Sequence, residues 1–218
     1  MGKMIVTKTK IAKEPYLMKE SGHLLYSYEE LCYYISSRMS LWVMEKERVG
    51  MTQWLFTCGV TIEDVDLLSP DEAAEKIITA GSYFYGTEKR QILDRINKFP
   101  EFPLSYVEKD RGDYYLSYGK IKKAYFSYEK AISSMTGEER EEWRNSLYHN
   151  MGIVCCRFFY WEEAKKWLFK AQEIMGKQET KNALSLVEDM LKKEWELGES
   201  PILTIELEKK KQEFLNEL

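Results

Sequence analysis

The chain has 218 residues, of which 44% are hydrophobic and 31% are charged. This balance is typical of a globular protein with one large domain or two small ones. The net charge of −4 argues against the broad basic surface of a nucleic-acid-binding protein. Because no apolar run approaches the ~20 residues of a membrane helix, we expect no membrane partner either.

The first part of the chain predicts an irregular segment followed by helices. Residues 1–22 are interrupted by Pro15 and Gly22, so an extended or irregular segment is expected there. Residues 23–99 are predicted to form a helical region. Ser27 and Ser69 mark two helix starts, since each is followed three residues later by a Glu, and Pro70 stands at the first helical position.

Further elements are expected on both sides of two prolines, Pro100 and Pro103, which interrupt the chain. Before them, helices are predicted near 52–58, ending at Gly59, and at about 87–98. After them, residues 104–176 predict paired helices, and 177–218 predict capping helices at about 180–197 and 205–218. The expected fold class is therefore all-α.

Two matching segments stand out in the second half of the chain. The first has Gly112, Ala124 and Ala131; the second has Gly152, Ala164 and Ala171, each 40 positions after its counterpart. Two helices approach closely only where a side chain is nearly absent. The spacing predicts two helical hairpins in which Ala124 and Ala164 face the glycines.

These positions resemble the tetratricopeptide repeat, a helix-turn-helix unit of ~34 residues with small residues where its helices cross. The resemblance covers residues 104–176 and implies antiparallel hairpins stacked as a short α-solenoid. It departs from the family pattern at Glu108, where an aromatic residue is usual, and at Arg111, where a large apolar residue is usual. The closing proline of the motif is also absent.

The resemblance implies a protein- or peptide-binding scaffold whose first helices line a concave groove. The lining positions it assigns are Tyr106, Lys109, Asp113, Leu116, His149, Asn150, Ile153, Cys156 and Arg157. Some relatives hold a peptide carboxylate with a basic and amide clamp. Lys109 and Asn150 match two positions of that clamp, but Asp113 replaces a third, and its charge would repel a carboxylate.

No catalytic, metal-binding or cofactor-binding constellation is apparent. The chain has two histidines, His23 and His149, and its glycines form no phosphate-binding loop. Its four cysteines form no C-x-x-C motif and predict reduced core thiols of a cytoplasmic protein. We therefore expect no enzyme, no cofactor and no metal.

Two alternatives to an adaptor remain open. One is a peptide-sensing regulator of a bacterial signalling system, although no DNA-binding helix-turn-helix is apparent in residues 23–98. The other is an enzyme with an unrecognised site. The aromatic run of residues 158–161 supplies a further exposed candidate, since Phe159 and Tyr160 fall at the predicted turn while Trp161 is expected in the core.

Overall fold

The computed structural model describes residues 8–198 and Lys209, and the side chains of the long last helix as far as residue 193. The described chain is all-α apart from one short two-stranded hairpin, which confirms the expected fold class. It divides into two compact units, residues 1–102 and 103–218, called unit 1 and unit 2 below. The predicted helix at 205–218 lies outside the described residues, except for Lys209.

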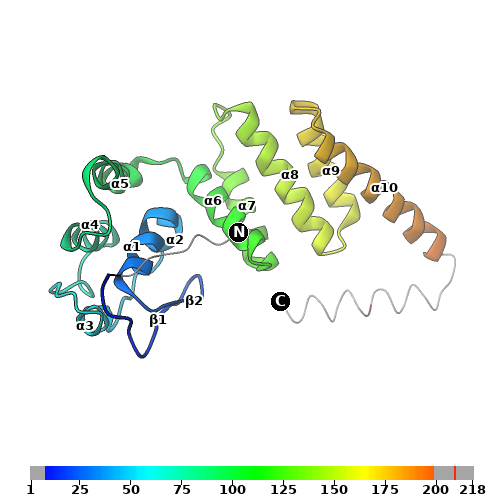
Figure 1. The fold of residues 1–218 in the computed structure, drawn as a ribbon. Coiled ribbons are helices and arrows are strands. Elements are labelled where there is room, and N and C mark those ends of the chain that lie inside the picture. The colour runs from blue at the N-terminus through cyan, green and yellow to red at the C-terminus, as the bar shows by residue number, and fades with distance from the viewer. Residues whose placement is uncertain (1–7, 199–208, 210–218) are drawn as a thin grey trace. The chain divides into compact units, whose positions relative to one another are not determined.

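Unit 1 consists of a β-hairpin and short helices (Figure 1). In chain order its elements are β1 (Tyr16–Met18), β2 (His23–Leu25), α1 (Tyr28–Ser37), α2 (Met39–Trp42), α3 (Met51–Thr57), α4 (Pro70–Ala80), α5 (Gly86–Lys98) and the 3-10 turn η1 (Phe99–Glu101). The strands are antiparallel and pair Leu17 with Leu24. The region predicted as helical from residue 23 thus opens with β2, which pairs with β1, and its first helix begins at Tyr28.

The two predicted helix starts are present in unit 1. Ser69 accepts the N–H of Glu72, and the Glu72 carboxylate accepts the N–H of Ser69, so the capping box of α4 is complete. Ser27 accepts the N–H of Glu30 in the same way. The Glu30 carboxylate, however, accepts the N–H of Tyr26 and not that of Ser27, so only half of this capping box forms.

Buried charged side chains fasten the irregular segments of unit 1 to its helices. The Glu29 carboxylate accepts the N–H groups of Lys8 and Thr9 at 2.8 and 2.9 Å, and the Thr9 hydroxyl at 2.6 Å. The Glu45 carboxylate accepts the N–H groups of Lys19 and Glu20 in the turn between β1 and β2. Each carboxylate thereby satisfies backbone donors that no helix or sheet would satisfy.

Arg48 acts on carbonyl groups in the same way. Its side chain is among the most buried of the described residues, with 1% exposed, and its guanidinium lies 5.4 Å from the centre of the Trp42 ring. It donates hydrogen bonds to the backbone carbonyls of Glu45, Val65 and Leu68. The loop between α3 and α4 is therefore held by one cation.

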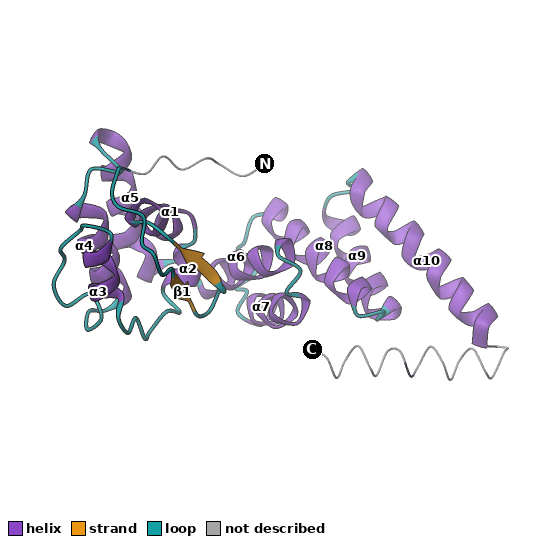
Figure 2. Cartoon of the chain, turned by 60° about the horizontal axis from the view of Figure 1, so that its bottom comes forward, coloured by secondary structure: helices purple, strands orange, loops and turns teal. Residues whose placement is uncertain are grey.

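Unit 2 is a row of helices in which each packs mainly on the next in sequence (Figures 1 and 2). They are α6 (Leu104–Ser117), α7 (Ile121–Ser133), α8 (Glu141–Arg157), α9 (Trp161–Ile174) and α10 (Gln178–Gly198). The expected helical content of this region is confirmed. The predicted capping helix also forms, and Ala183, Leu184, Val187 and Leu191 of α10 pack on the core that contains Cys155, Ala164 and Leu168.

The backbone hydrogen bonds repeat after 40 residues, as the small residues do. The α6–α7 hairpin (α6, α7 and their turn) and the α8–α9 hairpin turn through the same sequence of bonds. In the first hairpin the N–H groups of Gly119, Lys120 and Ala124 donate to the carbonyls of Leu116, Tyr115 and Lys120, respectively. In the second, the N–H groups of Phe159, Tyr160 and Ala164 donate to the carbonyls of Cys156, Cys155 and Tyr160, each 40 positions later. The same main-chain turn is thus built twice.

The glycines allow close helix packing, and the atoms nearest to them belong to large side chains of the second helices. A Cβ atom on Gly112 would lie 2.4 Å from the Tyr128 ring, and one on Gly152 would lie 2.6 Å from the Leu168 side chain. The large residues 128 and 168 occupy the space beside the glycines, which the expectation for Ala124 and Ala164 did not include. A glycine makes room for a large side chain as readily as for a nearby backbone, and the spacing alone does not distinguish these cases.

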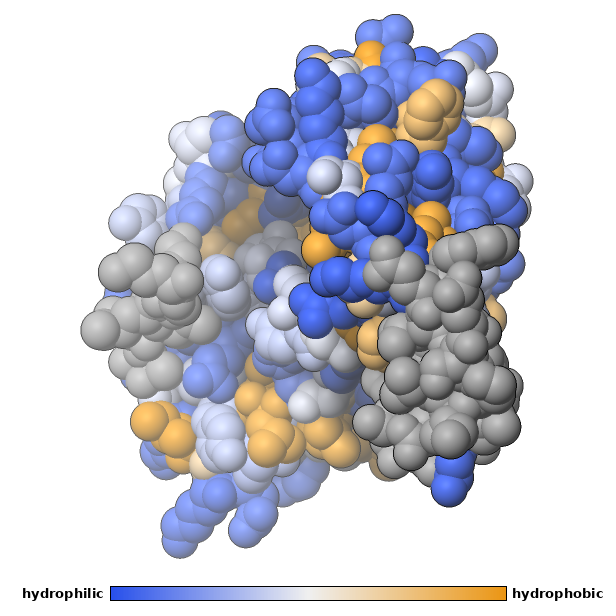
Figure 3. Space-filling view, turned by 90° about the vertical axis from the view of Figure 1, so that its right-hand side faces the viewer, coloured by the Kyte–Doolittle hydropathy of each residue, from blue (hydrophilic) through white to orange (hydrophobic). Residues whose placement is uncertain are grey.

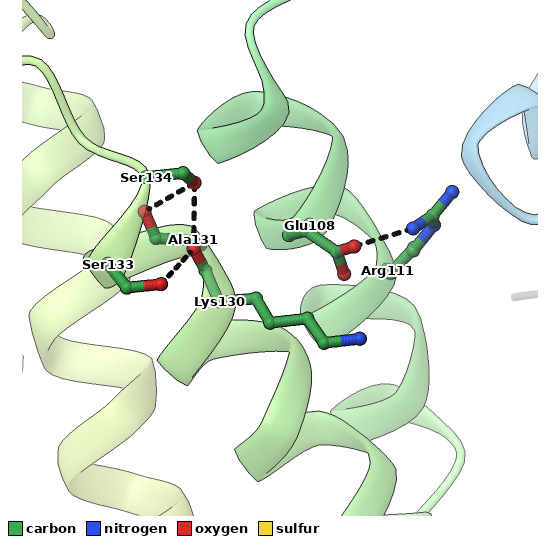
Figure 4. Close-up of polar contacts among 6 residues, drawn as sticks. All are labelled: Glu108, Arg111, Lys130, Ala131, Ser133 and Ser134. Atoms are coloured by element: carbon green, nitrogen blue, oxygen red, sulfur yellow. Dashed lines mark hydrogen bonds and ion pairs between the residues drawn. The ribbon is translucent and has the colours of Figure 1, made fainter.

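The repeated alanines Ala124, Ala131, Ala164 and Ala171 are all fully buried. The two departures from the repeat pattern lie close together as well. The Glu108 and Arg111 side chains, 6% and 13% exposed, form an ion pair of 2.7 Å on α6 (Figure 4). A charged pair thus stands at two positions that are aromatic and apolar in the repeat that the sequence resembles, and each member supplies the partner that burial requires.

Candidate partner-binding surface

The predicted lining residues fall on α6 and α8, and contacts between these helices and α10 connect them in one line. The rings of Tyr106 on α6 and Trp143 on α8 stack with their centres 4.7 Å apart. Further along the same helices, Asn150 donates a hydrogen bond of 2.9 Å to Asp113. From α8, the His149 Nδ1 atom lies 3.0 Å from the Thr180 hydroxyl of α10. We call this line of side chains the α6–α8–α10 face.

Asp113 is the centre of its polar contacts. One carboxylate oxygen accepts the Tyr128 hydroxyl at 2.8 Å and the Asn150 amide at 2.9 Å. The other oxygen accepts the Lys109 ammonium at 2.6 Å. Burial, followed by the negative charge of Asp113, raises the pKa of Tyr128, so its hydroxyl remains a donor. One carboxylate therefore joins α6, α7 and α8.

This arrangement changes the interpretation of the expected carboxylate clamp. Lys109 and Asn150 both donate to a carboxylate, but the carboxylate is that of Asp113 in the same chain. Lys109 is also buried, with 7% of its surface exposed, and its loss would leave Asp113 without its cation. Asn150 thereby links α8 to α6, whereas Lys109 neutralises the same carboxylate from within α6.

His149 has a comparable position between α8 and α10. Burial lowers the pKa of its imidazole, with the charge of Glu179 acting in the opposite direction. A neutral ring can either donate to or accept from the Thr180 hydroxyl, according to its tautomer. The side chain thus connects the second hairpin to the helix that follows it.

The other predicted lining residues leave surface available to a partner. Leu116, Ile153 and Cys156 are half-buried, and Arg157 is exposed at the end of α8. Within the described residues, the Arg157 guanidinium makes no hydrogen bond or ion pair. An extended peptide could therefore contact apolar groups in the middle of the face and a cation at its end.

The turn between α8 and α9 carries the exposed aromatic candidates. Phe159 and Tyr160 are 41% and 40% exposed, whereas Trp161 packs against the core. Phe159 has a φ of +59°, a conformation that glycine adopts far more easily. On the face shown in Figure 3, apolar groups form separate patches among hydrophilic side chains.

A surface pocket in unit 1 was not predicted. It has a volume of about 540 Å³ and lies between α1, the α4–α5 connection and α5. Charged and polar residues of its wall, Glu88, Gln91 and Arg95, recur every three or four positions along α5. That spacing places them on one helix face and is the signal that sequence reasoning missed.

The described part of the chain contains neither a metal-binding cluster nor a membrane-spanning helix. There, His, Cys, Asp and Glu side chains form no group of three or more that could bind a metal ion. None of the helices in residues 8–198 combines the length and apolar character that crossing a bilayer requires. Comparison with known proteins gave no matching family model, no matching curated protein and no matching solved structure.

Proposed function

We propose that unit 2 is a short tetratricopeptide-like array and that the protein is a non-catalytic adaptor binding a protein or peptide on the α6–α8–α10 face. The 40-residue repetition of small residues and of turn hydrogen bonds supports the repeat assignment. Contacts that run directly from α6 to α8 and from α8 to α10 support a common face of first helices. Repeats of this kind commonly present extended binding surfaces.

The observation that carries the proposal is that some polar side chains of this face bind one another, while others stay exposed to solvent. Lys109, Asp113 and Asn150 satisfy one another, while Ile153 remains half-exposed and Arg157 is fully available. Arginine is enriched among the residues that dominate interface energies, and its planar fork binds carboxylates in bidentate fashion. The proposed ligand is therefore an extended segment with an apolar side chain over Ile153 and an acidic group at Arg157.

Peptide selection on the intact chain tests this proposal. A displayed library of random peptides would be selected on the full-length protein, and the selected peptides would be titrated by calorimetry. Arg157→Ala or Ile153→Ser should weaken binding by at least about fivefold, which corresponds to roughly 1 kcal/mol. The folded state of each variant would be checked by circular dichroism.

Arg140→Ala is the matched control, because Arg140 is also exposed and lies at the other end of α8. Its affinity should equal that of the unmodified protein. The adaptor proposal for this face is wrong if the selected peptides bind the Arg157 and Ile153 variants as tightly as the control. If the selected peptides lose affinity only when Phe159 or Tyr160 is replaced, the interface lies at the α8–α9 turn.

A further inference from the structure

The pocket of unit 1 combines an apolar wall, rich in aromatic rings, with two side chains of opposite charge. Its apolar wall consists of Tyr33 on α1, Tyr83 and Phe84 in the α4–α5 connection, and Ile92 on α5. The Tyr83 and Phe84 rings lie 4.6 Å apart and are tilted by 60°. A volume of about 540 Å³ is within the range of small-molecule sites.

Glu88 and Arg95 line the same pocket from one side of α5. Within the described residues neither forms an ion pair. The two residues are seven positions apart on the helix, so their backbone positions are separated by about 10 Å. The helix therefore presents an anion and a cation about two turns apart.

The Arg95 guanidinium is already oriented. Its Nη2 atom donates a hydrogen bond of 2.6 Å to the carbonyl of Ser36, in the last turn of α1. This contact uses one of the five guanidinium N–H donors and adds no negative charge, so the remaining donors can bind a carboxylate. The charge of Glu88 also contributes, after burial and Cys32, to raising the pKa of Tyr83, so the phenol beside it stays neutral.

The separation of about 10 Å between the two helix positions limits the ligand. An extended chain rises by about 3.3–3.6 Å per residue, so three residues span about 10 Å. A free tripeptide has an ammonium group at one end, a carboxylate at the other and a side chain between them. We propose that this pocket binds a short free peptide of about three residues, with its amino group at Glu88, its carboxylate at Arg95 and an apolar central side chain against the rings.

This site is distinct from the α6–α8–α10 face and does not depend on the adaptor proposal. Binding would be measured by calorimetry on the full chain with Ala-Leu-Ala. Three altered peptides would be compared with it: the N-acetylated form, the C-amidated form and Ala-Gly-Ala. Each removes one proposed contact, so each should bind about tenfold more weakly than Ala-Leu-Ala, as expected for the loss of a charged hydrogen bond or of a buried aliphatic side chain.

Variants of the protein assign each ligand end to its residue. In Glu88→Gln, acetylation of the peptide should no longer weaken binding, while amidation still does. In Arg95→Gln the pattern should be reversed. Arg90→Gln, an exposed change on the same helix outside the pocket, should behave like the unmodified protein.

The Glu88 variant keeps the test valid even if loss of the Arg95–Ser36 contact disturbs folding, because the Glu88 side chain makes no hydrogen bond among the described residues. The proposal is overturned if none of the peptides binds at millimolar concentration. It is also overturned if the free and capped peptides bind alike, or if acetylation weakens binding to Glu88→Gln as much as to the unmodified chain. Arg157→Ala should leave tripeptide binding unchanged, which separates this result from the test of the adaptor surface.

Discussion

The two units are held together by different kinds of contact. In unit 2, each helix packs on its neighbour in sequence, and the small residues and turn bonds of one hairpin recur 40 residues later. In unit 1, short elements are joined by the buried charged groups of Glu29, Glu45 and Arg48, which bind backbone atoms as far as 17 to 26 residues away. The first kind of contact leaves a period in the sequence, whereas the second leaves single charged residues that look like ordinary surface positions.

The two units also differ in how much a single residue contributes to the free energy of unfolding. A repeated helical array spreads its stability over many similar contacts between neighbours. A buried cation that satisfies several carbonyl groups concentrates stability in one side chain, because each abandoned partner then loses its hydrogen bond without regaining water. Single charged residues should therefore matter more in unit 1 than most positions do in unit 2.

The largest effect is expected at Arg48. Replacement by Met keeps most of the apolar stem but removes the donors to the carbonyls of Glu45, Val65 and Leu68. We expect the free energy of unfolding to fall by about 3–5 kcal/mol. Hydrogen exchange of amides in residues 8–102 would measure it, with the exposed Arg90→Met as control. A loss below about 1 kcal/mol would show that Arg48 is not the main anchor of its loop.

Unit 2 also contains buried charged side chains, in the Glu108–Arg111 ion pair. Arg111→Leu alone leaves the Glu108 carboxylate buried without this cation, and should cost about 2–4 kcal/mol. Combining it with Glu108→Phe restores the aromatic and apolar types usual in the repeat family. Because apolar pairs often replace buried ion pairs without loss, the double variant should recover to within about 1 kcal/mol of the original.

Urea unfolding of the two variants would decide this point. A double variant as unstable as the single one would mean that the ion pair has become necessary to this chain. The comparison between the units would then be less sharp, since unit 2 would also depend on a buried charge.

Glu29 and Glu45 predict opposite dependences on pH. Burial alone would raise the pKa of Glu29, but hydrogen bonds from Thr9 and Lys8 outweigh it and hold the pKa below its usual value. Its contribution is therefore complete above the ordinary carboxyl range and is lost as the pH falls through the folded-state pKa. Burial raises the pKa of Glu45, so the folded chain gains stability as the pH falls through that value.

The corresponding glutamine variants measure these slopes. Glu29→Gln should cost about 1–3 kcal/mol at pH 7, and this cost should shrink towards pH 4. For Glu45→Gln the stability lost relative to the original chain should instead grow as the pH falls from 7. Denaturation curves at pH 7, 5.5 and 4 give both series. Parallel slopes for the two variants would contradict the assigned directions.

The contrast between periodic contacts in unit 2 and single buried charges in unit 1 also explains which elements could be predicted from the sequence. The helices of unit 2 and the capped start of α4 at Ser69 were predicted because their signals are local or periodic. The strand β2 was missed because a three-residue strand has too short a pattern and depends on its pairing with β1. The anchors Glu29 and Arg48 were missed since nothing near them in sequence indicates that they are buried.

The candidate surface was predictable only in position. The repeat resemblance places Lys109, Asp113 and Asn150 on one face, and the structure joins them. It could not tell which polar atoms would bind each other and which would be left for a partner. That depends on side-chain geometry across three helices, as does the place of the Tyr128 ring against Gly112.

The smallest effect tests how closely the two hairpins of unit 2 repeat each other. Gly119 and Phe159 are equivalent turn positions with φ values of +69° and +59°. An added Cβ on Gly119 would have nothing within 4 Å, so Gly119→Ala measures backbone strain alone and should cost about 1 kcal/mol.

At Phe159 the same strain is separated from the loss of the ring by comparing two variants. Both Phe159→Ala and Phe159→Gly remove the edge contact with Trp161, whose ring centre lies 5.8 Å away. Only glycine relieves the positive φ, so Phe159→Gly should be more stable than Phe159→Ala by about 1 kcal/mol. In an ordinary helical position the order is the reverse by about the same amount. Thermal melts of the pair therefore distinguish a turn whose geometry is imposed by the repeat from one that relaxes around each residue, and alanine above glycine at 159 would rule out the imposed turn.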